Sequence, residues 1–199
     1  MTAAPAGVVL AAGAGTRFGG TKAMVTIGGE TLVDRAARTL RAGGCTPIVV
    51  VLGARHDEVR ATARLTDVEV VENLQWATGM ASSLRCGLDA AAAANAPAAV
   101  VALVDQPGIT PEVVRRLIAR WTAGAEAVVA TYDGQPRNPV LLDASVWPEV
   151  AAAATGDVGA RAWLRANPDR VAAAPCDDIA DARDIDTPAD LAAAVNEPM

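Results

Sequence analysis

The 199-residue sequence has few of the side chains on which many protein classes depend. Aromatic residues make up 3% of the chain, histidine occurs once, and the three cysteines lie far apart without a Cys-x-x-Cys pair. A structural zinc site or a disulfide framework is therefore not expected. A serine or cysteine hydrolase of the triad type would have to use His56, which we interpret as a surface loop residue.

Positive charge is also scarce, because 17 Lys and Arg against 23 Asp and Glu give a formal net charge of −6. Nucleic-acid-binding proteins usually carry a basic patch and stacking aromatics, so nucleic acid is not an expected partner. The longest uncharged runs, 1–16 and 90–104, are shorter than the roughly 20 apolar residues of a membrane-spanning helix, so no membrane partner is expected. No Lys or Arg precedes Arg17, so the basic start of a signal peptide is missing and we expect a cytoplasmic protein.

The apolar residues form short runs that alternate with helix-like stretches. Strands are expected over residues 7–11, 48–52, 68–71, 98–104, 127–131 and 139–142. Helices are expected over residues 31–41, 82–94 and 157–166, and at the Thr-Pro pairs 110–111 and 187–188. This alternation predicts one α/β domain over residues 1–199, a three-layer sandwich with a mainly parallel, doubly wound, Rossmann-like sheet. Ligands of such sheets bind at the carboxyl ends of the strands, so the loops that follow strands should carry the chemistry.

The first strand runs into a glycine-rich loop that contains two cations, Arg17 and Lys22. Glycines let the backbone approach a ligand closely and present N–H groups to phosphate oxygens. The dinucleotide-binding fingerprint does not fit, because Phe18 stands where the third glycine is required. A Walker loop does not fit either, because Thr21 separates Gly20 from Lys22. A phosphate-binding loop and a plain tight turn both remain open from these residues alone.

Two aspartates stand at positions where a carboxylate can bind a metal ion or cap a helix. Asp105 follows the apolar run 98–104 directly, and Asp186 precedes Thr187, whose helix-capping partner is Asp190. Strand-end carboxylates can hold Mg²⁺, which takes few protein ligands and several phosphate oxygens. A local turn or capping role is the alternative for each aspartate.

These segments resemble the molybdenum cofactor cytidylyltransferases, a family of MobA-like nucleotidyltransferases. The family signature, close to LAAGxSxRMGxxK, is matched at Leu10, Ala11, Ala12, Gly13, Arg17, Gly19 and Lys22. Gly15 replaces the usual serine, and Phe18 stands where methionine is usual. The segments LVDQPG at 103–108 and DIDTPADL at 184–191 are similar to two further family motifs, so the resemblance extends from residue 8 to about residue 191.

The resemblance implies a nucleotidyltransferase fold and a metal site in which Asp105 and Asp186 hold Mg²⁺ as the cofactor. It implies that Lys22, Arg17 and Asp105 are the catalytic residues. The nucleotide site that it implies comprises Leu10, Ala11, Ala12, Gly13, Gly15, Lys22, Gly79, Ser82 and Ser83. Helix capping is the alternative for the two serines. In the family, alanine at the position of Ala12 accompanies cytidine transfer and glycine accompanies guanylyl transfer, which points to CTP.

Two more segments resemble the acceptor-binding elements of the family, GDxGAR at 156–161 and GNPVLL near 138–142. They imply acceptor binding by Asn138, Pro139, Asp157 and Arg161. The guanidinium of Arg161 can fork onto phosphate oxygens, and a solvated helix arginine is the alternative. Asn138 stands where some members have histidine, which keeps other acceptors open.

We therefore predict transfer of CMP from CTP to the phosphate of molybdopterin, with release of pyrophosphate and with a molybdenum hydroxylase as recipient. Such a reaction depends on positioning and charge neutralisation, so it needs no histidine or thiol nucleophile. One alternative is a nucleotidyltransferase with a sugar or alcohol phosphate as acceptor. The others are an NAD(P)H-dependent oxidoreductase, like the relatives that carry the name nicotine blue oxidoreductase, and a non-catalytic module such as a cofactor chaperone.

Overall fold

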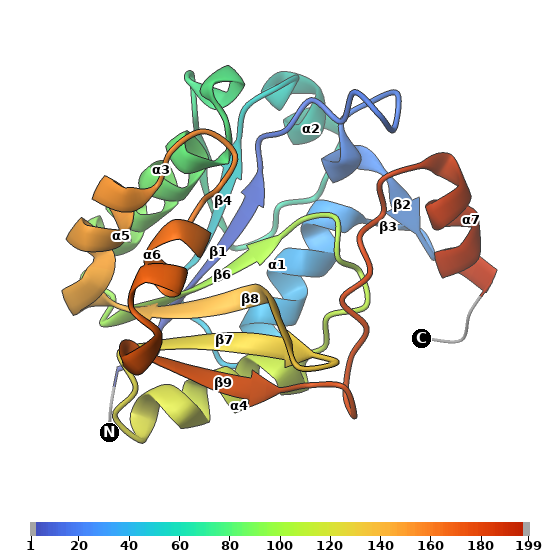
Figure 1. The fold of residues 1–199 in the computed structure, drawn as a ribbon. Coiled ribbons are helices and arrows are strands. Elements are labelled where there is room, and N and C mark those ends of the chain that lie inside the picture. Colours follow the sequence, from blue (N-terminus) through green and yellow to red (C-terminus); the bar gives the residue numbers. More distant parts are fainter. Residues whose placement is uncertain (1–2, 197–199) are drawn as a thin grey trace.

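The computed structural model describes residues 3–196, which form a central sheet with helices on both faces (Figure 1). The seven strands of the sheet lie in the order β5-β4-β1-β6-β8-β7-β9. Their bounds are β1 (Ala6–Ala11), β4 (Ile48–Leu52), β5 (Glu69–Glu72), β6 (Ala98–Leu103), β7 (Ala127–Tyr132), β8 (Gln135–Asp143) and β9 (Val171–Pro175). Every pairing is parallel except those of β8 with β6 and β7, so the predicted mainly parallel α/β sheet is confirmed.

The helices cover the two faces because successive strand residues point to opposite sides. In β1, Val9 and Ala11 pack into one apolar cluster, whereas Val8 and Leu10 pack into the other. The first cluster is covered by α1 (Leu32–Ala42), α2 (His56–Thr62) and α4 (Pro111–Thr122). The second is covered by α3 (Met80–Ala93), α5 (Trp147–Ala153) and α6 (Arg161–Ala166). The doubly wound, three-layer arrangement is therefore confirmed.

Short 3₁₀ helices and a separate hairpin complete the described elements. The 3₁₀ helices are η1 (Lys22–Met24), η2 (Trp76–Thr78), η3 (Ala144–Val146) and η4 (Pro168–Arg170). The hairpin pairs β2 (Thr26–Ile27) with β3 (Glu30–Thr31). No helix among residues 3–196 combines the length and apolar character that a bilayer crossing requires.

The reversed strand β8 differs from the predicted strand, which was limited to residues 139–142. It begins at Gln135, directly after the turn that joins it to β7. Asp133 and Gly134 both have positive φ in this turn, 50° and 69°, the conformation that an Asp-Gly pair favours in tight hairpins. The hairpin places β8 between β6 and β7 and so reverses one strand of an otherwise parallel sheet.

Two local predictions were wrong. The helix expected over residues 157–166 begins at Arg161, because the preceding residues form turns in which Gly156 and Gly159 have positive φ. His56, interpreted as a loop residue, is the first residue of α2, and its Nε2 lies 3.2 Å from Oε1 of Glu72.

The strap, residues 176–187, leads from β9 to α7 (Pro188–Asn196) without regular secondary structure. Figure 1 shows it running along the carboxyl ends of the strands, from the β9 edge towards the β2–β3 hairpin. The Cys176 N–H donates to the Thr131 carbonyl at 2.9 Å, and the Ile185 N–H donates to the Asp105 carbonyl at 2.8 Å. The Ile185 side chain is buried against Leu32. The strap thereby brings Asp184 and Asp186 to the end of β6.

Candidate functional site

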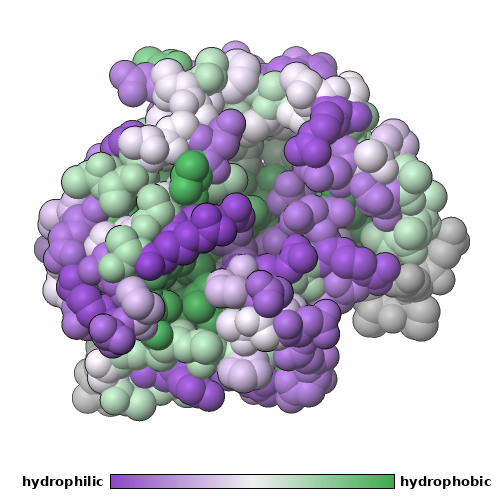
Figure 2. Space-filling model, viewed as in Figure 1, coloured by the Kyte–Doolittle hydropathy of each residue, from purple (hydrophilic) through white to green (hydrophobic). Residues whose placement is uncertain are grey.

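A cleft of about 470 Å³ lies at the carboxyl ends of β1 and β6, where a doubly wound sheet binds its ligands. Its walls come from the glycine-rich loop after β1, the start of α3, the turns before α6, and the strap. Figure 2 shows this face hollowed, with hydrophilic residues along the rim on the strap side. The lining residues are Leu10, Ala12, Gly13, Gly15, Thr16, Arg17, Lys22, Trp76, Gly79, Met80, Ser83, Leu103, Val104, Asp105, Asp157 and Asp186.

The glycine-rich loop is closed upon itself by the carbonyl oxygen of Gly15. This oxygen accepts hydrogen bonds from the N–H groups of Phe18, Gly19 and Gly20 at 3.0, 3.0 and 3.2 Å. Gly15 has a φ of +62°, and a Cβ at this position would lie 2.0 Å from the Gly20 carbonyl oxygen. Only glycine fits here, so the loop that carries Arg17 into the cleft depends on this residue.

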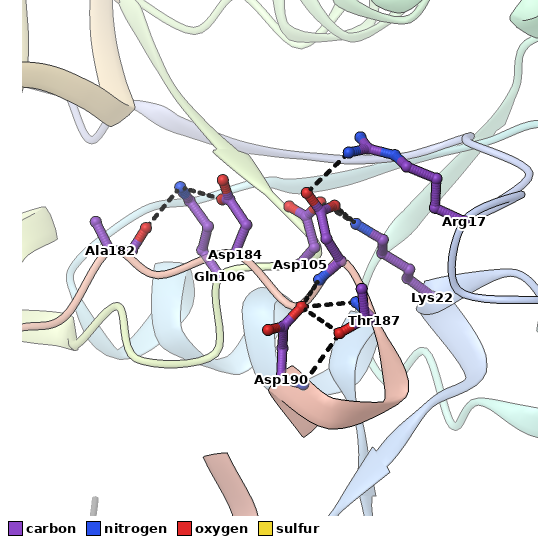
Figure 3. Close-up of polar contacts among 9 residues, drawn as sticks. Arg17, Lys22, Asp105, Gln106, Ala182, Asp184, Thr187 and Asp190 are labelled. Carbon is purple, nitrogen blue, oxygen red and sulfur yellow. Dashed lines mark hydrogen bonds and ion pairs between the residues drawn. The ribbon is translucent and has the colours of Figure 1, made fainter. Parts of the chain in front are cut away.

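A charge cluster at the floor of the cleft joins three distant parts of the chain (Figure 3). The Lys22 Nζ lies 2.8 Å from Oδ2 of Asp105 and 2.6 Å from Oδ1 of Asp186. The Arg17 Nη1 lies 3.3 Å from the other oxygen of Asp186, Oδ2. These four side chains were predicted to act together, and the fold brings them into contact.

Burial and ion pairing act in opposite directions on Lys22, whose side chain is 14% exposed. Burial lowers its pKa, but the hydrogen bonds and charges of Asp105 and Asp186 outweigh burial and raise the pKa above the ordinary value. The hydrogen bond from Lys22 in turn lowers the pKa of Asp186. Both partners are therefore held in their charged forms at neutral pH.

The donor set fits a divalent cation that is shared with a phosphorylated substrate. Asp105 has a second oxygen, Oδ1, that is buried and has no hydrogen-bond partner in the described structure. A buried acceptor without a donor is unusual and suits a cation. Among residues 3–196 no three His, Cys, Asp or Glu side chains form a metal-binding group. Mg²⁺ typically takes one or two carboxylates together with substrate phosphates, which matches this pair.

Gln106 joins the strap to the end of β6 and was missed by the sequence analysis. Its Nε2 donates to Oδ1 of Asp184 at 2.9 Å and to the Ala182 carbonyl at 3.3 Å (Figure 3). The side chain is 8% exposed, which is unusual for a glutamine in a loop. A buried amide directly after Asp105 positions the strap, and with it Asp186, opposite Asp105.

The start of α3 is met by the turns that precede α6. The Met80 N–H donates to Oδ1 of Asp157 at 3.2 Å, and the Ala81 N–H donates to the Gly156 carbonyl at 2.8 Å. Gly79 has a φ of +111°, and a Cβ there would lie 2.5 Å from the Gly156 carbonyl oxygen. Asp157, predicted on the acceptor side, therefore lines the cleft and also satisfies a free N–H at a helix start.

The two predicted serines differ in position. Asn73, which is 2% exposed, donates through Nδ2 to the hydroxyl of Ser82 at 2.8 Å and to that of Ser83 at 3.0 Å. Ser83 lines the cleft, whereas the Ser82 hydroxyl lies 2.9 Å from the Gly79 carbonyl and is used inside the protein. Sequence reasoning missed Asn73, although a polar residue directly after a strand was a usable signal.

Comparison with known proteins decides the family. The profile of the MobA-like NTP transferase domain matches residues 7–172. The chain belongs to this family. The nucleotidyltransferase class that the motifs predict is thereby confirmed. The match ends before the strap, so Asp184 and Asp186 lie outside the matched part of this MobA-like chain.

Two curated relatives of this MobA-like chain carry different names. Nicotine blue oxidoreductase from Paenarthrobacter nicotinovorans is 42% identical over 189 residues, 91% of each chain. Molybdenum cofactor guanylyltransferase from Cereibacter sphaeroides (strain ATCC 17029 / ATH 2.4.9) is 35% identical over 166 residues, 83% of this chain and 77% of the relative. The second name agrees with the nucleotidyltransferase family, whereas the first names a different reaction.

Solved structures agree with the MobA-like fold. Rv0371c from Mycobacterium tuberculosis H37Rv superposes with a TM-score of 0.82 at 26% identity, covering 99% of this chain and 100% of the other. A second structure of Rv0371c, in complex with manganese, has a TM-score of 0.70 at 27% identity, covering 87% and 88%.

The remaining predicted residues of this MobA-like chain do not line the cleft. Ala11 is 2% exposed and packs against the helices of the opposite face, because it alternates with Leu10 and Ala12 along β1. On β8, Asn138 is half-buried and Pro139 is buried in an irregular part of the strand. Arg161 is exposed at the start of α6. The acceptor roles of the last three residues stay predictions.

Replacing Asp184 by asparagine is expected to stabilise this MobA-like protein at neutral pH. Burial raises the pKa of the Asp184 carboxyl, and the charges of Asp105 and Asp186 raise it further, against the hydrogen bond from Gln106. The pKa of Asp184 in the folded protein therefore lies above its value in the unfolded chain. As pH rises from the unfolded to the folded pKa, the unfolded chain ionises more readily, and the free energy of unfolding falls. The gain from Asp184→Asn should be present at pH 7 and absent at pH 3, as measured by urea unfolding. An equal effect at both pH values would contradict the charge argument.

Proposed function

We propose that the chain transfers CMP from CTP to the phosphate of molybdopterin or its molybdenum-containing form, with Mg²⁺ as cofactor. The observation that carries this proposal is the cluster in which Lys22 contacts both Asp105 and Asp186 beside the glycine-rich loop. The manganese complex of Rv0371c supports a divalent cation in the family. A molybdenum hydroxylase would receive the product.

In the proposed reaction an oxygen of the acceptor phosphate attacks the α-phosphorus of CTP. A new phosphorus–oxygen bond forms, and the bond to the bridging oxygen breaks, so that pyrophosphate leaves with the electron pair. A divalent cation would supply positive charge at the phosphates that Asp105 and Asp186 face. Lys22 and Arg17 line the same cleft, and their charges stabilise the transferring and leaving phosphates. No side chain of the protein needs to act as nucleophile.

CTP rather than GTP is proposed because of Ala12. This residue lines the cleft together with Leu10 and Gly13, and 5% of its surface is exposed. Its carbonyl accepts the Ala54 N–H at 3.0 Å, which fixes the backbone of the loop. The resemblance associates alanine here with cytidine transfer, whereas the Cereibacter relative is named a guanylyltransferase.

The nicotine blue oxidoreductase relative supports a second candidate function, because it is 42% identical over 91% of both chains. This candidate is an NAD(P)H-dependent oxidoreductase. Arg17, Lys22, Asp105 and Asp186 favour the transferase, because hydride transfer does not require paired carboxylates and phosphate-binding cations. A sugar or alcohol phosphate is the alternative acceptor for the transferase.

The deciding experiment measures pyrophosphate release with CTP, GTP, ATP and UTP in turn, in the presence of Mg²⁺ and molybdenum cofactor. We expect release with CTP to exceed release with GTP by about tenfold or more, a difference of ~1.4 kcal/mol in transition-state binding. The matched variant is Ala12→Gly, for which the preference should move towards GTP.

Other results would replace the proposal. A preference for GTP in the unaltered protein would make it a guanylyltransferase. Release only with a sugar or alcohol phosphate would retain CTP and change the acceptor. No release with any nucleotide, together with oxidation of NADH or NADPH by nicotine blue, would establish the oxidoreductase.

A further inference from the structure

We propose that Lys22 is an internal counterion that fills the cation position between Asp105 and Asp186 and leaves it only when a triphosphate enters. The divalent cation and the nucleotide then bind together, and the cation alone binds weakly. This inference deepens the proposed function and rests on its cation-dependent transfer. Lys22 thereby has a second role: besides its charge on the phosphates, it keeps the cation position filled until a triphosphate binds.

The distances show that the ammonium and a cation compete for one space. The Lys22 Nζ lies 2.8 Å from Oδ2 of Asp105 and 2.6 Å from Oδ1 of Asp186. Mg²⁺ bound to the same two oxygens would lie about 2.0–2.1 Å from each. Two positive centres cannot share this position, because steric overlap and charge repulsion both oppose it. Lys22 must therefore move before these two oxygens can bind a cation jointly.

The charges of the cluster explain why a triphosphate would release Lys22. Lys22 and Arg17 balance Asp105 and Asp186, so these four side chains together carry no net charge. A divalent cation alone adds two uncompensated positive charges to a partly enclosed site, which is unfavourable. A triphosphate compensates them and offers the ammonium new oxygen partners. The flexible four-carbon stem of lysine permits this exchange.

The partial burial of Lys22 makes the competition strong. Its side chain is 14% exposed and that of Asp105 is 21% exposed, so water screens this pair only in part. The second oxygen of Asp105 is buried without a hydrogen-bond partner, so Lys22 is the principal compensation of this carboxylate. Without Lys22, the Asp105 carboxylate has no close positive partner among the described residues and therefore binds an added cation more tightly.

Arg17 provides the comparison that separates occupation from charge alone. It carries the same charge and also pairs with Asp186, but its Nη1 lies 3.3 Å away and its side chain is 79% exposed. It has no contact with Asp105 among the ion pairs of the described residues. If the net charge of the cleft alone kept cations out, the loss of either side chain would have a similar effect. If occupation does so, the loss of Lys22 has a much larger effect.

The experiment measures binding of Mn²⁺ alone to the full chain, without nucleotide, from the electron paramagnetic resonance signal of free Mn²⁺. We expect Lys22→Met to bind Mn²⁺ about tenfold or more tightly than the unaltered protein, because the ammonium that occupies the position between Asp105 and Asp186 is removed. Arg17→Met should change the affinity by about threefold at most, because exposed pairs contribute little. Adding Asp105→Asn to Lys22→Met should remove the gain.

Urea unfolding first establishes that each variant is folded, and Lys22→Ala replaces Lys22→Met where the latter does not fold. The proposal is overturned if folded Lys22→Met binds Mn²⁺ no more tightly than the unaltered protein. It is equally overturned if Arg17→Met gives the same gain. None of these results depends on which nucleotide or acceptor reacts, so failure of the proposed transfer is recognised separately, in the pyrophosphate assay.

Discussion

Replacing Asp105 by asparagine should lower kcat/KM for nucleotidyl transfer by about a thousandfold or more, equivalent to ~4 kcal/mol of transition-state stabilisation. The carboxylate meets Lys22 at 2.8 Å and has a buried second oxygen available to a cation. Asparagine keeps the size of the side chain but loses the charge that both contacts require. The fold should persist, because the Asp105 backbone carbonyl still accepts the Ile185 N–H.

Asp169→Asn is the matched control for this change. Asp169 is exposed in η4, just before β9, and therefore lies at the end of the sheet opposite the cleft. Pyrophosphate release should be unchanged in this variant, and both variants should unfold at urea concentrations close to that of the unaltered protein. Undiminished cation-dependent release by folded Asp105→Asn would remove Asp105 from the proposed metal site.

Gly15→Ala should weaken nucleotide binding by about a hundredfold, because it distorts the loop on which binding depends. The added Cβ would lie 2.0 Å from the Gly20 carbonyl oxygen, so the loop must open. Opening it disrupts the three hydrogen bonds that converge on the Gly15 carbonyl. Arg17 lies within this loop and would lose its ion pair with Asp186.

Gly28→Ala separates the effect of the contact from that of the backbone conformation. Gly28 has the same φ as Gly15, +62°, but a Cβ there meets no atom within 4 Å. Its substitution should cost about 1 kcal/mol of stability through the φ preference alone. Nucleotide affinity, measured by isothermal titration calorimetry with CTP, should be unchanged in Gly28→Ala and reduced in Gly15→Ala. Equal affinities would show that the loop tolerates the alanine.

The parallel core of the fold could be predicted because its strands are buried on both faces and appear as continuous apolar runs. Residues 48–52, all buried, formed the strand expected there. The strand β9 could not be predicted, because its residues Val171–Pro175 are mostly alanine and include a single β-branched side chain, Val171. Alanine-rich sequence favours helix on its own, and only pairing with β7 makes this segment a strand.

The charge cluster could be anticipated because each of its members stands in a local pattern, a glycine-rich loop, a strand end or a helix cap. The supporting contacts could not, because their partners are far away in the sequence. Gln106 binds the strap 78 positions later, and Asp157 meets the start of α3 77 positions earlier. Ser82 differs in this respect, because the partners of its hydroxyl, Asn73 and the Gly79 carbonyl, are close to it in the sequence.

The strap also determines when the protein becomes competent during its synthesis. Lys22 and Asp186 are separated by 164 positions, so their contact must wait until the segment between them has been synthesised. Domains begin to form from the N-terminal side as the polypeptide leaves the ribosome, and β1, β4 and β6 can pair before the strap exists. We therefore expect a nascent chain to acquire its sheet first and the proposed cation site later. A growing polypeptide with most of its core assembled would then lack half of the carboxylate pair and be inactive until Asp186 has left the ribosome.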